Sequence, residues 1–353
     1  MITDIRLQHF RSYQDDSFEF DPGVNIIVGP NASGKTNLLE AILVACVGGS
    51  YRVRDAELVK HDQPWSRLDI HTDKGARTVK LETPEGHSRL KKTVTVDGKP
   101  YLRLPLHKTV PVVLFEPNHL QLLHGSPELR REFLDNLLEQ TTAGFGVIRR
   151  QYKRALAQRN ALLKQEQRFA DQQLFAWNIR LSELGGQIAA SRQGLIGKIN
   201  DRLGGLYQDL SQSSQKIEVS YLTSCEGVNY SSRLLQKLEA GSSLDYQRGF
   251  TAYGPHRDDL EIKLGGYTAA EAASRGEVRT LLLGLKIIEM QLQEEAHGQR
   301  PLLLLDDVFS ELDGSRRKAL TDYLSNHQTF ITTTDADVVV QHFMDKCRII
   351  PLG

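Results

Sequence analysis

The chain has 353 residues, enough for two hydrophobic cores, and its 44 basic residues are balanced by 44 acidic ones. This balance neither favours nor excludes a nucleic-acid partner, which would need a local cluster of cations. No apolar run approaches the roughly 18 residues of a membrane-spanning helix, and the N-terminus has no secretion-signal pattern. Three scattered cysteines form neither a disulfide framework nor a metal motif, so we expect a cytoplasmic protein with no membrane partner.

The first residues alternate like a β-strand over 2–7, and a second short strand is expected at 17–20. Residues 24–36, VNIIVGPNASGKT, then join a β-branched run to the pattern G-x-x-x-x-G-K-[ST]. This pattern is typical of a phosphate-binding P-loop that lies between a strand and a helix. The required helix is predicted from Asn37 to about Val47.

Each residue type in the loop has a chemical reason. Gly29 and Gly34 let the backbone turn tightly, so that successive N–H groups point at phosphate oxygens. Lys35 is expected to contact the β- and γ-phosphates as a catalytic residue, and the Thr36 hydroxyl to ligate Mg²⁺. The residues expected to contact ATP are Gly29, Pro30, Asn31, Ala32, Ser33, Gly34, Lys35, Thr36 and Asn37.

The middle of the chain changes from strand to helix patterning. Residues 67–72, 76–82 and 93–97 predict antiparallel strands, and the apolar run 110–115 predicts a buried strand. Leucines and isoleucines at helical spacing within 128–210 predict two long helices that pack as a hairpin or small bundle. Further predicted elements are strands at 216–222, at 261–264 and around 349, a helix at 274–296, and a surface connection around a short helix at 224–247.

The second half of a nucleotide site is indicated late in the chain. Leu302 to Leu305 form an apolar run that ends in Asp306, the Walker B pattern of a strand covered on both faces. Because the carboxyl end of such a strand faces the ligand crevice, Asp306 is expected to hold Mg²⁺. Asp307 is expected to orient or deprotonate the attacking water, which makes it the second catalytic candidate. Asp313 follows in Ser-Glu-Leu-Asp and can also be a helix N-cap.

The tetrapeptide Ser274-Arg275-Gly276-Glu277 opens the long helix that precedes the Walker B strand. A Ser and a Gly at a helix N-terminus can bind an anion through backbone N–H groups, a hydroxyl and the helix dipole. Serine is also a favoured N-cap, so the tetrapeptide alone is a weak signal. Its position shortly before the Walker B strand is what favours a role for Ser274 and Gly276 at the nucleotide.

The order of these motifs is the order found in ABC-type ATPases. Four further stretches, HFRSY (9–13), GSPELRREFLD (125–135), YGPHRDDL (253–260) and SRGEVRTLLL (274–283), resemble the RecF family of bacterial DNA replication and repair proteins. The resemblance covers nearly the whole chain.

The resemblance implies an α/β fold with two parts. An ABC-type P-loop ATPase head, a mixed sheet with flanking helices, would comprise residues 1–124 and 250–353. A mainly helical inserted subdomain would comprise residues 125–249.

The family resemblance also implies an ATP-dependent homodimer with ATP between the P-loop of one subunit and Ser274 and Gly276 of the other. Asp313 would lie along the dimer seam, and Arg11 and Arg52 are weaker candidates near the nucleotide. The implied function is a weak, DNA-stimulated ATPase that binds double-stranded or gapped DNA and releases it on slow hydrolysis. It would help to load recombinase at gaps in recombinational repair and the SOS response, with RecR and RecO as partners.

Three positions depart from the patterns of related ATPases. Asp307 stands where transporters and SMC-like proteins usually have Glu, and its shorter side chain predicts slow hydrolysis. The segment Thr332-Thr333-Thr334-Asp335 lacks the switch histidine of transporter ATPases. Ala32 replaces a glycine common in other P-loops, and its methyl group is tolerable if its φ is negative.

A basic run could form the DNA surface. Residues 146–168 contain seven basic residues and one acidic residue, Glu166. Arg149 with Lys153, and Arg150 with Arg154, are four residues apart, so each pair projects from one helical face. Such a stripe can neutralise phosphates without reading bases, although a solvated charged face has the same pattern.

Three other functions fit parts of the sequence. The head of an SMC- or Rad50-like machine is disfavoured because long heptads are absent. A transport ATPase is disfavoured by the missing switch histidine and by the basic helical insert. A DNA-binding scaffold that holds ATP without productive turnover differs from the leading interpretation only in hydrolysis.

Overall fold

The computed structural model describes residues 1–50, 52–84, 90–116, 119, 121–165, 167–211, 213–227, 229–324, 326–335, 339, 341, 343 and 347–353, and their side chains except 167–172, 310 and 311. The chain forms two compact units. The head unit comprises residues 1–119 and 289–353, and the helical unit comprises residues 120–288.

The head unit contains a five-stranded sheet in the order β14-β3-β13-β12-β8, in which every pairing is parallel. Every residue of β8, β12 and β13 is buried, which explains the apolar run of β8 and the four leucines of β12. Because the strands are parallel, all their carboxyl ends lie at one edge of the sheet. The strands are β3 (Val24–Val28), β8 (Val112–Phe115), β12 (Leu302–Asp306), β13 (Thr329–Thr333) and β14 (Cys347–Pro351).

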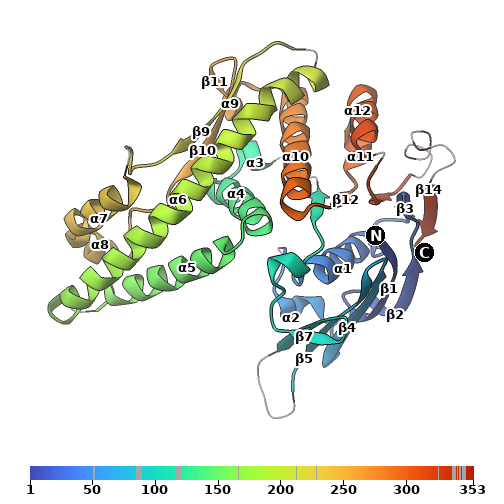
Figure 1. The fold of residues 1–353 in the computed structure, drawn as a ribbon, viewed down its shortest axis with the longest axis horizontal. Helices are drawn as coiled ribbons and strands as arrows, with labels where there is room; N and C mark the ends of the chain where they lie inside the picture. The colour runs from blue at the N-terminus through green and yellow to red at the C-terminus, as the bar shows by residue number, and fades with distance from the viewer. Residues whose placement is uncertain are drawn as a thin grey trace. The chain divides into compact units, whose positions relative to one another are not determined.

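Helix α1 (Lys35–Val47) follows β3 and packs against strands of both sheets of the head unit (Figure 1). All residues from Leu38 to Cys46 are buried, as expected for a helix that is apolar on every side. The second sheet is antiparallel, in the order β2-β1-β4-β5-β6-β7. Its strands are β1 (Ile2–Phe10), β2 (Tyr13–Glu19), β4 (Trp65–Thr72), β5 (Gly75–Glu82), β6 (Lys91–Val96) and β7 (Lys99–Tyr101).

These sheets confirm the predicted α/β class, with the parallel and antiparallel strands in separate sheets. The predicted strands within residues 1–115 all form, and so do the Walker B strand and the terminal strand. The short helices of the head unit are α2 (Asp55–Leu58), η1 (Leu106–Lys108), α11 (Val308–Glu311) and α12 (Gly314–Leu324).

The helical unit is built on two long helices, α5 (Phe145–Leu162) and α6 (Gln167–Ser211), which pack side by side as predicted (Figure 1). A three-stranded antiparallel sheet has the order β11-β10-β9. The remaining elements are α3 (Gln121–His124), α4 (Pro127–Thr141), β9 (Ile217–Leu222), α7 (Tyr230–Ala240), α8 (Ser242–Arg248), β10 (Asp259–Leu264), β11 (Tyr267–Thr268), α9 (Ala269–Ala272) and α10 (Arg275–His297), whose last residues belong to the head unit.

The second boundary between the units differs from the expected one at residue 250. Strand β10 pairs with β9 along its whole length, from Asp259 opposite Leu222 to Leu264 opposite Ile217. Arg130 on α4 also forms a two-pronged ion pair with Asp259. Residues 250–288 therefore belong to the helical unit, and the head resumes only within α10. The first boundary, after residue 119, lies close to the expected one.

The region 224–247 contains two helices rather than one short helix in a surface connection. Tyr230, Leu234 and Leu238 on α7 are all buried. Their spacing of four residues is the signal that identifies a packed helix in this Ser-rich stretch. The segment is therefore part of the core of the helical unit.

Arg159, one of the seven residues of the basic run, lies inside the helical unit. Arg159 and Asp245 are both fully buried, and Arg159 Nη1 donates to Asp245 Oδ2 at 2.7 Å. Its guanidinium also donates to Asn178 and Thr251. Arg159 is therefore a structural cation and cannot contact DNA.

Cys46 and Cys225 are buried thiols, and Cys347 is partly exposed on β14. In the described parts of the chain, no helix is long and apolar enough to cross a membrane.

Candidate nucleotide site

The carboxyl edge of the parallel sheet gathers polar residues from segments far apart in the sequence. The P-loop follows Val28 at the end of β3, β12 ends at Asp306, and Glu116 follows the last residue of β8. Strand β13 lies between β3 and β12, with Thr332 opposite Asp306. This edge is where ligands bind in open α/β sheets.

Both glycines of the P-loop are required by its geometry. Gly34 has a φ of +100°, and a Cβ at this position would lie 2.9 Å from the Tyr13 hydroxyl oxygen. A Cβ on Gly29 would lie 2.6 Å from both the Leu352 carbonyl oxygen and Ser33 Oγ. A side chain is therefore excluded at both positions for steric reasons, and at Gly34 also by the left-handed backbone.

Lys35 and Ser33 present polar groups within this loop. Lys35 is only 5 % exposed, and its Nζ donates to the carbonyl oxygens of Gly29 at 2.8 Å and Pro30 at 2.9 Å. Ser33 Oγ is buried and has no hydrogen-bond partner among the described residues. A buried ammonium and an unsatisfied hydroxyl are groups that phosphate oxygens can satisfy.

Thr36 and Asp306, the two predicted Mg²⁺ ligands, are brought together by the fold. Thr36 Oγ1 lies 2.9 Å from Asp306 Oδ1 and 3.1 Å from Oδ2. Thr332 Oγ1 donates to Asp306 Oδ1 at 2.9 Å, and Arg52 Nη2 donates to Oδ2 at 3.0 Å. The buried Asp306 carboxylate is therefore surrounded by donors from three separate segments.

Glu116 is a site residue that the sequence interpretation missed. Its side chain is 7 % exposed and forms an ion pair with Arg52, which also binds Asp306. The signal was available in the sequence. Glu116 directly follows the apolar run 110–115, just as Asp306 ends the apolar run of the Walker B strand. Arg52, a weaker candidate, thus bridges two carboxylates at the edge of the sheet.

Asp307 has an unusual backbone conformation. Its φ is +54°, in the left-handed region, and it is the N-cap of α11. Its N–H donates to Thr332 Oγ1 at 2.9 Å. Thr332 therefore links Asp306 and Asp307, and holds the backbone in a conformation that is unfavourable for a residue with a side chain.

The segment His9 to Tyr13 supports the start of α1. Tyr13 donates its hydroxyl hydrogen to the Gly34 carbonyl oxygen at 3.0 Å. Burial raises the pKa of Tyr13, so the hydroxyl keeps its proton. Asn37 donates to Ser12 Oγ at 2.9 Å, and its expected contact with the nucleotide stays a prediction. Ser12 and Tyr13 therefore hold the end of the P-loop and the start of α1 through hydrogen bonds.

Arg11 is connected to Arg52 through the buried Glu40 and the partly buried Ser50. Arg11 Nε donates to Glu40 Oε2 at 2.8 Å, and Ser50 Oγ donates to Glu40 Oε1 at 2.7 Å. Ser50 Oγ in turn accepts a hydrogen bond from the Arg52 N–H at 3.0 Å. Arg11 thus positions the loop that carries Arg52.

Ala32 does not have the negative φ that would make its methyl group easy to tolerate. Its φ is +67°, in the left-handed region that favours glycine. The P-loop forces this conformation, and for a residue with a Cβ it costs about 1 kcal/mol.

Ser274 begins α10 with a capping box. Its N–H and Oγ donate to Glu277 Oε2 at 2.8 Å and 2.7 Å, and the Glu277 N–H donates to Ser274 Oγ at 3.3 Å. The hydrogen bond from Ser274 lowers the pKa of Glu277. Ser274 is exposed, and Gly276 lies in the first turn.

Asp313 is the N-cap of α12, one of the two functions considered for it. Its Oδ1 accepts hydrogen bonds from the Arg316 N–H at 3.0 Å and from Ser315 Oγ at 2.9 Å. These bonds, with the adjacent Arg316 guanidinium, lower the pKa of Asp313. The side chains of Ser310 and Glu311 lie outside the described residues.

The four residues chosen from the basic run differ in their surroundings. Arg149 is largely buried and forms ion pairs with Asp135 at 3.1 Å and Glu139 at 3.0 Å. Lys153 and Arg154 are exposed and Arg150 is partly exposed. The Arg168 side chain lies outside the described residues.

These residues fit a magnesium nucleotide. Mg²⁺ is usually held by one or two carboxylates, waters and substrate phosphates rather than by a cage of protein ligands. Consistent with that pattern, the described residues contain no cluster of three or more His, Cys, Asp or Glu suited to a metal. Asp306, Thr36 and the unsatisfied Ser33 hydroxyl supply the hard oxygen atoms that such a complex requires.

Comparison with known proteins identifies the family of the chain. Residues 4–239 match a family model described as an AAA domain. The chain is 36 % identical over 343 residues to the DNA replication and repair protein RecF of Heliobacterium modesticaldum, covering 94 % of the chain and 92 % of the relative. It is 35 % identical over 373 residues to the protein of the same name from Chloroflexus aurantiacus, covering 97 % and 95 %.

Solved structures show the same fold. A structure described as the recombination mediator protein RecF-ATP in the RecFOR pathway has a TM-score of 0.84 at 31 % identity, covering 95 % of the chain and 92 % of that protein. An Smc head bound to the C-winged helix domain of ScpA has a TM-score of 0.52 at 16 % identity, covering 97 % and 92 %. This second likeness concerns the fold alone.

Proposed function

The chain belongs to the RecF family of DNA replication and repair proteins, and on that premise we propose that ATP closes two copies of it on DNA. It is an ATP-binding protein of replication and repair, with the ATPase fold of its relatives. Hydrolysis would then reopen the dimer and release the DNA.

The contact between Thr36 and Asp306 is the observation that carries this proposal. The two residues come from the P-loop helix and the Walker B strand, and their oxygen atoms lie 2.9 Å apart. A P-loop alone is compatible with many functions. Its union with a Walker B pair, Asp306 and Asp307, at one edge of the sheet supports hydrolysis of ATP.

Each residue of the site has a chemical role in this proposal. Lys35, Ser33 and the loop N–H groups bind the phosphates, while Thr36 and Asp306 hold Mg²⁺. When bound, Mg²⁺ neutralises charge on the phosphate oxygens. Asp307 accepts a proton from the attacking water. Because the Asp307 side chain is shorter than that of Glu, we expect slow turnover. We also expect DNA to stimulate it, as the family resemblance implies.

The second copy of the chain would complete the site. Ser274 and Gly276 lie at the start of a long helix, where a hydroxyl and backbone N–H groups can meet the phosphates bound to the partner. Asp313 would line the dimer seam. Because this contact exists only in the closed dimer, ATP would favour closure by its higher affinity for that state.

Sedimentation of the full chain tests this proposal. ATP with Mg²⁺ should convert monomer to dimer, and Ser274→Arg should abolish the conversion while ATP affinity is retained. Ser232→Arg, at an exposed serine on α7, is the matched control. A wild-type chain that stays monomeric with ATP and DNA would contradict the proposal.

Double-stranded or gapped DNA is the proposed ligand of the closed dimer. Exposed Lys153 and Arg154, with the partly exposed Arg150, support this on the helical unit. Arg149 contributes less because Asp135 and Glu139 already neutralise it. Since a similar protein is described as a recombination mediator of the RecFOR pathway, we also propose RecR and RecO as partners and recombinase loading at gaps as the outcome.

A scaffold that holds ATP without productive turnover is the second candidate. The Asp307 side chain is short and its backbone is held in the left-handed region, which supports slow or absent hydrolysis. The ATP-hydrolysing switch and the scaffold differ only in whether the bound ATP is hydrolysed and phosphate is released.

A further inference from the structure

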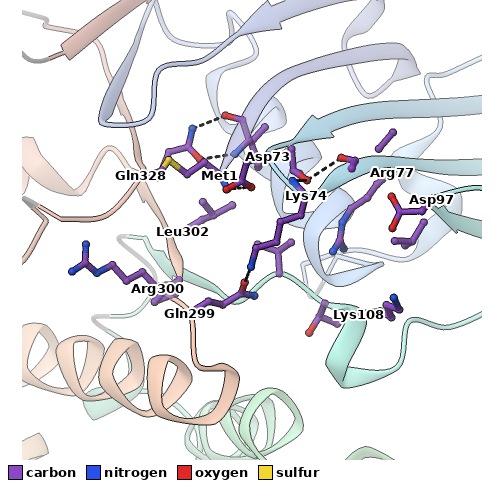
Figure 2. Close-up of a pocket in the computed structure, with 18 of the residues that line it drawn as sticks. Met1, Asp73, Lys74, Arg77, Asp97, Lys108, Gln299, Arg300, Leu302 and Gln328 are labelled. Carbon is purple, nitrogen blue, oxygen red and sulfur yellow. Dashed lines mark hydrogen bonds and ion pairs between the residues drawn. The ribbon is translucent and has the colours of Figure 1, made fainter.

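A cavity of about 310 Å³ lies in the head unit (Figure 2). Leu302 at the start of β12, Gln328 just before β13 and Val110 just before β8 line it. These residues mark the amino ends of the parallel strands. The cavity is therefore at the sheet edge opposite to Asp306 and the P-loop.

Cations outnumber anions among the groups that line the cavity. The lining charged groups are the amino terminus of Met1, Lys74, Arg77, Lys108 and Arg300 against the carboxylates of Asp73 and Asp97. The Met1 ammonium is paired with Asp73. This local excess of positive charge occurs in a chain with a formal net charge of zero.

Arg77 and Lys108 are the cavity cations without an ion pair, although the Asp97 carboxylate lies near Arg77 and offsets part of its charge. Both are partly buried, and neither forms an ion pair with the described residues. The Arg77 guanidinium donates one hydrogen bond, to the Cys46 carbonyl oxygen at 3.3 Å, so most of its N–H groups have no partner in the described chain. Burial lowers the pKa of Arg77, which means that its cation is incompletely hydrated.

Lys74, three residues before Arg77, is a further donor in the lining of this cavity. Lys74 reaches across to Gln299 and donates to its Oε1 at 2.6 Å, while Arg77 lies beside Asp97 (Figure 2). A partly desolvated guanidinium without a bidentate partner is a preferred ligand for phosphate oxygens. The volume is at the lower end of the range for small-molecule sites, about 300–1,000 Å³.

We propose that this cavity binds a phosphate group, with Arg77 and Lys108 as its charged ligands. The group would come from a small molecule the size of a mononucleotide or from the end of a nucleic-acid strand. The site is separate from the ATP site and does not depend on the function proposed for it.

Equilibrium dialysis with labelled inorganic phosphate tests the proposal on the full chain. A Lys35→Ala background removes the P-loop as a phosphate site, and this variant should still bind phosphate. Adding Arg77→Gln or Lys108→Gln should weaken the remaining binding by about tenfold or more. Adding Arg103→Gln, an exposed arginine outside the cavity, should leave the affinity unchanged.

Two results would overturn the proposal: no phosphate binding in the Lys35→Ala variant, or binding that neither cavity substitution weakens. Arg77→Gln and Lys108→Gln are also made with Lys35 intact, and ATP binding by these two variants shows that the head is folded. If Arg77→Gln impairs folding, the result with Lys108→Gln is used to test the proposal. Displacement of labelled phosphate by AMP but not by a 5′-phosphorylated oligonucleotide would identify a small-molecule site. Displacement by AMP and by the 5′-phosphorylated oligonucleotide, but not by the same oligonucleotide with a 5′-hydroxyl end, would identify a strand end.

Discussion

Arg52 Nη2 lies 3.0 Å from Asp306 Oδ2, so a guanidinium contacts the same carboxylate that is expected to hold Mg²⁺. Arg52 also pairs with Glu116. The Glu116 and Asp306 side chains are only 7 % and 9 % exposed, and both approach the same cation. Arg52 therefore compensates two negative charges that would otherwise repel each other at the carboxyl edge of the sheet.

The substitution Arg52→Ala should destabilise the metal-free head by about 2 kcal/mol, because it leaves two buried carboxylates without their shared cation. Mg²⁺ should then stabilise the variant more than it stabilises the wild type, since the ion can replace the lost charge. Thermal unfolding with and without Mg²⁺ measures both effects. Equal melting temperatures for Arg52→Ala and the exposed control Arg103→Ala would show that the bridge contributes nothing.

The substitution Asp307→Asn should leave ATP affinity unchanged and slow phosphate release by at least about 100-fold, the contribution of a general base. Asparagine tolerates the left-handed backbone at this position, so the variant separates chemistry from folding. Asp62→Asn is a matched control, because Asp62 also has a positive φ, +62°, and is exposed. Equal release by wild type and Asp307→Asn would favour the scaffold function.

His256 should make the helical unit lose stability in mild acid. It lies between Tyr152 and Thr251, which contact its two ring nitrogens, and burial lowers its pKa to about 4 from the ordinary 6.5. Nearby cations, Arg257, Arg131 and Arg159, act in the same direction. The unfolded chain binds the extra proton first, so stability is lost as the pH falls from about 6.5 to about 4. The loss amounts to about 3 kcal/mol.

Denaturant unfolding of a Trp65→Phe background measures this loss, because Trp177 on α6 is then the only tryptophan and reports on the helical unit. His256→Gln should be less stable than its parent at pH 7. The difference between the two proteins should shrink toward pH 4. A difference that is independent of pH would show that folding does not shift the pKa of His256.

Removing charge at Arg150, Lys153 and Arg154 by substitution with Gln should weaken duplex binding and flatten its salt dependence. Each lost phosphate contact lowers the slope of log affinity against log salt by roughly 0.9. Substitution of Lys198, Lys216 and Arg233 by Gln removes the same number of exposed charges elsewhere on the helical unit. If the two triple variants have the same slope as wild type, the α5 residues are not the DNA surface.

Local sequence was enough to predict the P-loop, the Walker B strand and the long helices. Each is specified by residues within a few positions of one another, such as Gly29 to Thr36 or Leu302 to Asp306. The motif alone predicts glycine at residues 29 and 34, and the structure adds the distant contacts with Leu352 and Tyr13 that exclude a Cβ there. The motifs also resemble those of the RecF family, and the comparisons confirm that the chain belongs to it.

Tertiary structure alone decided which distant residues meet. Glu116 and Arg52 join Asp306 because parallel strands place their carboxyl ends at one edge. Residues 259–264 belong to the helical unit because β10 pairs with β9, a long-range register that no local pattern reveals. Arg159 looked like a member of a basic stripe, yet it is buried against Asp245. Charge and spacing are properties of the chain, but burial and pairing depend on the packed fold.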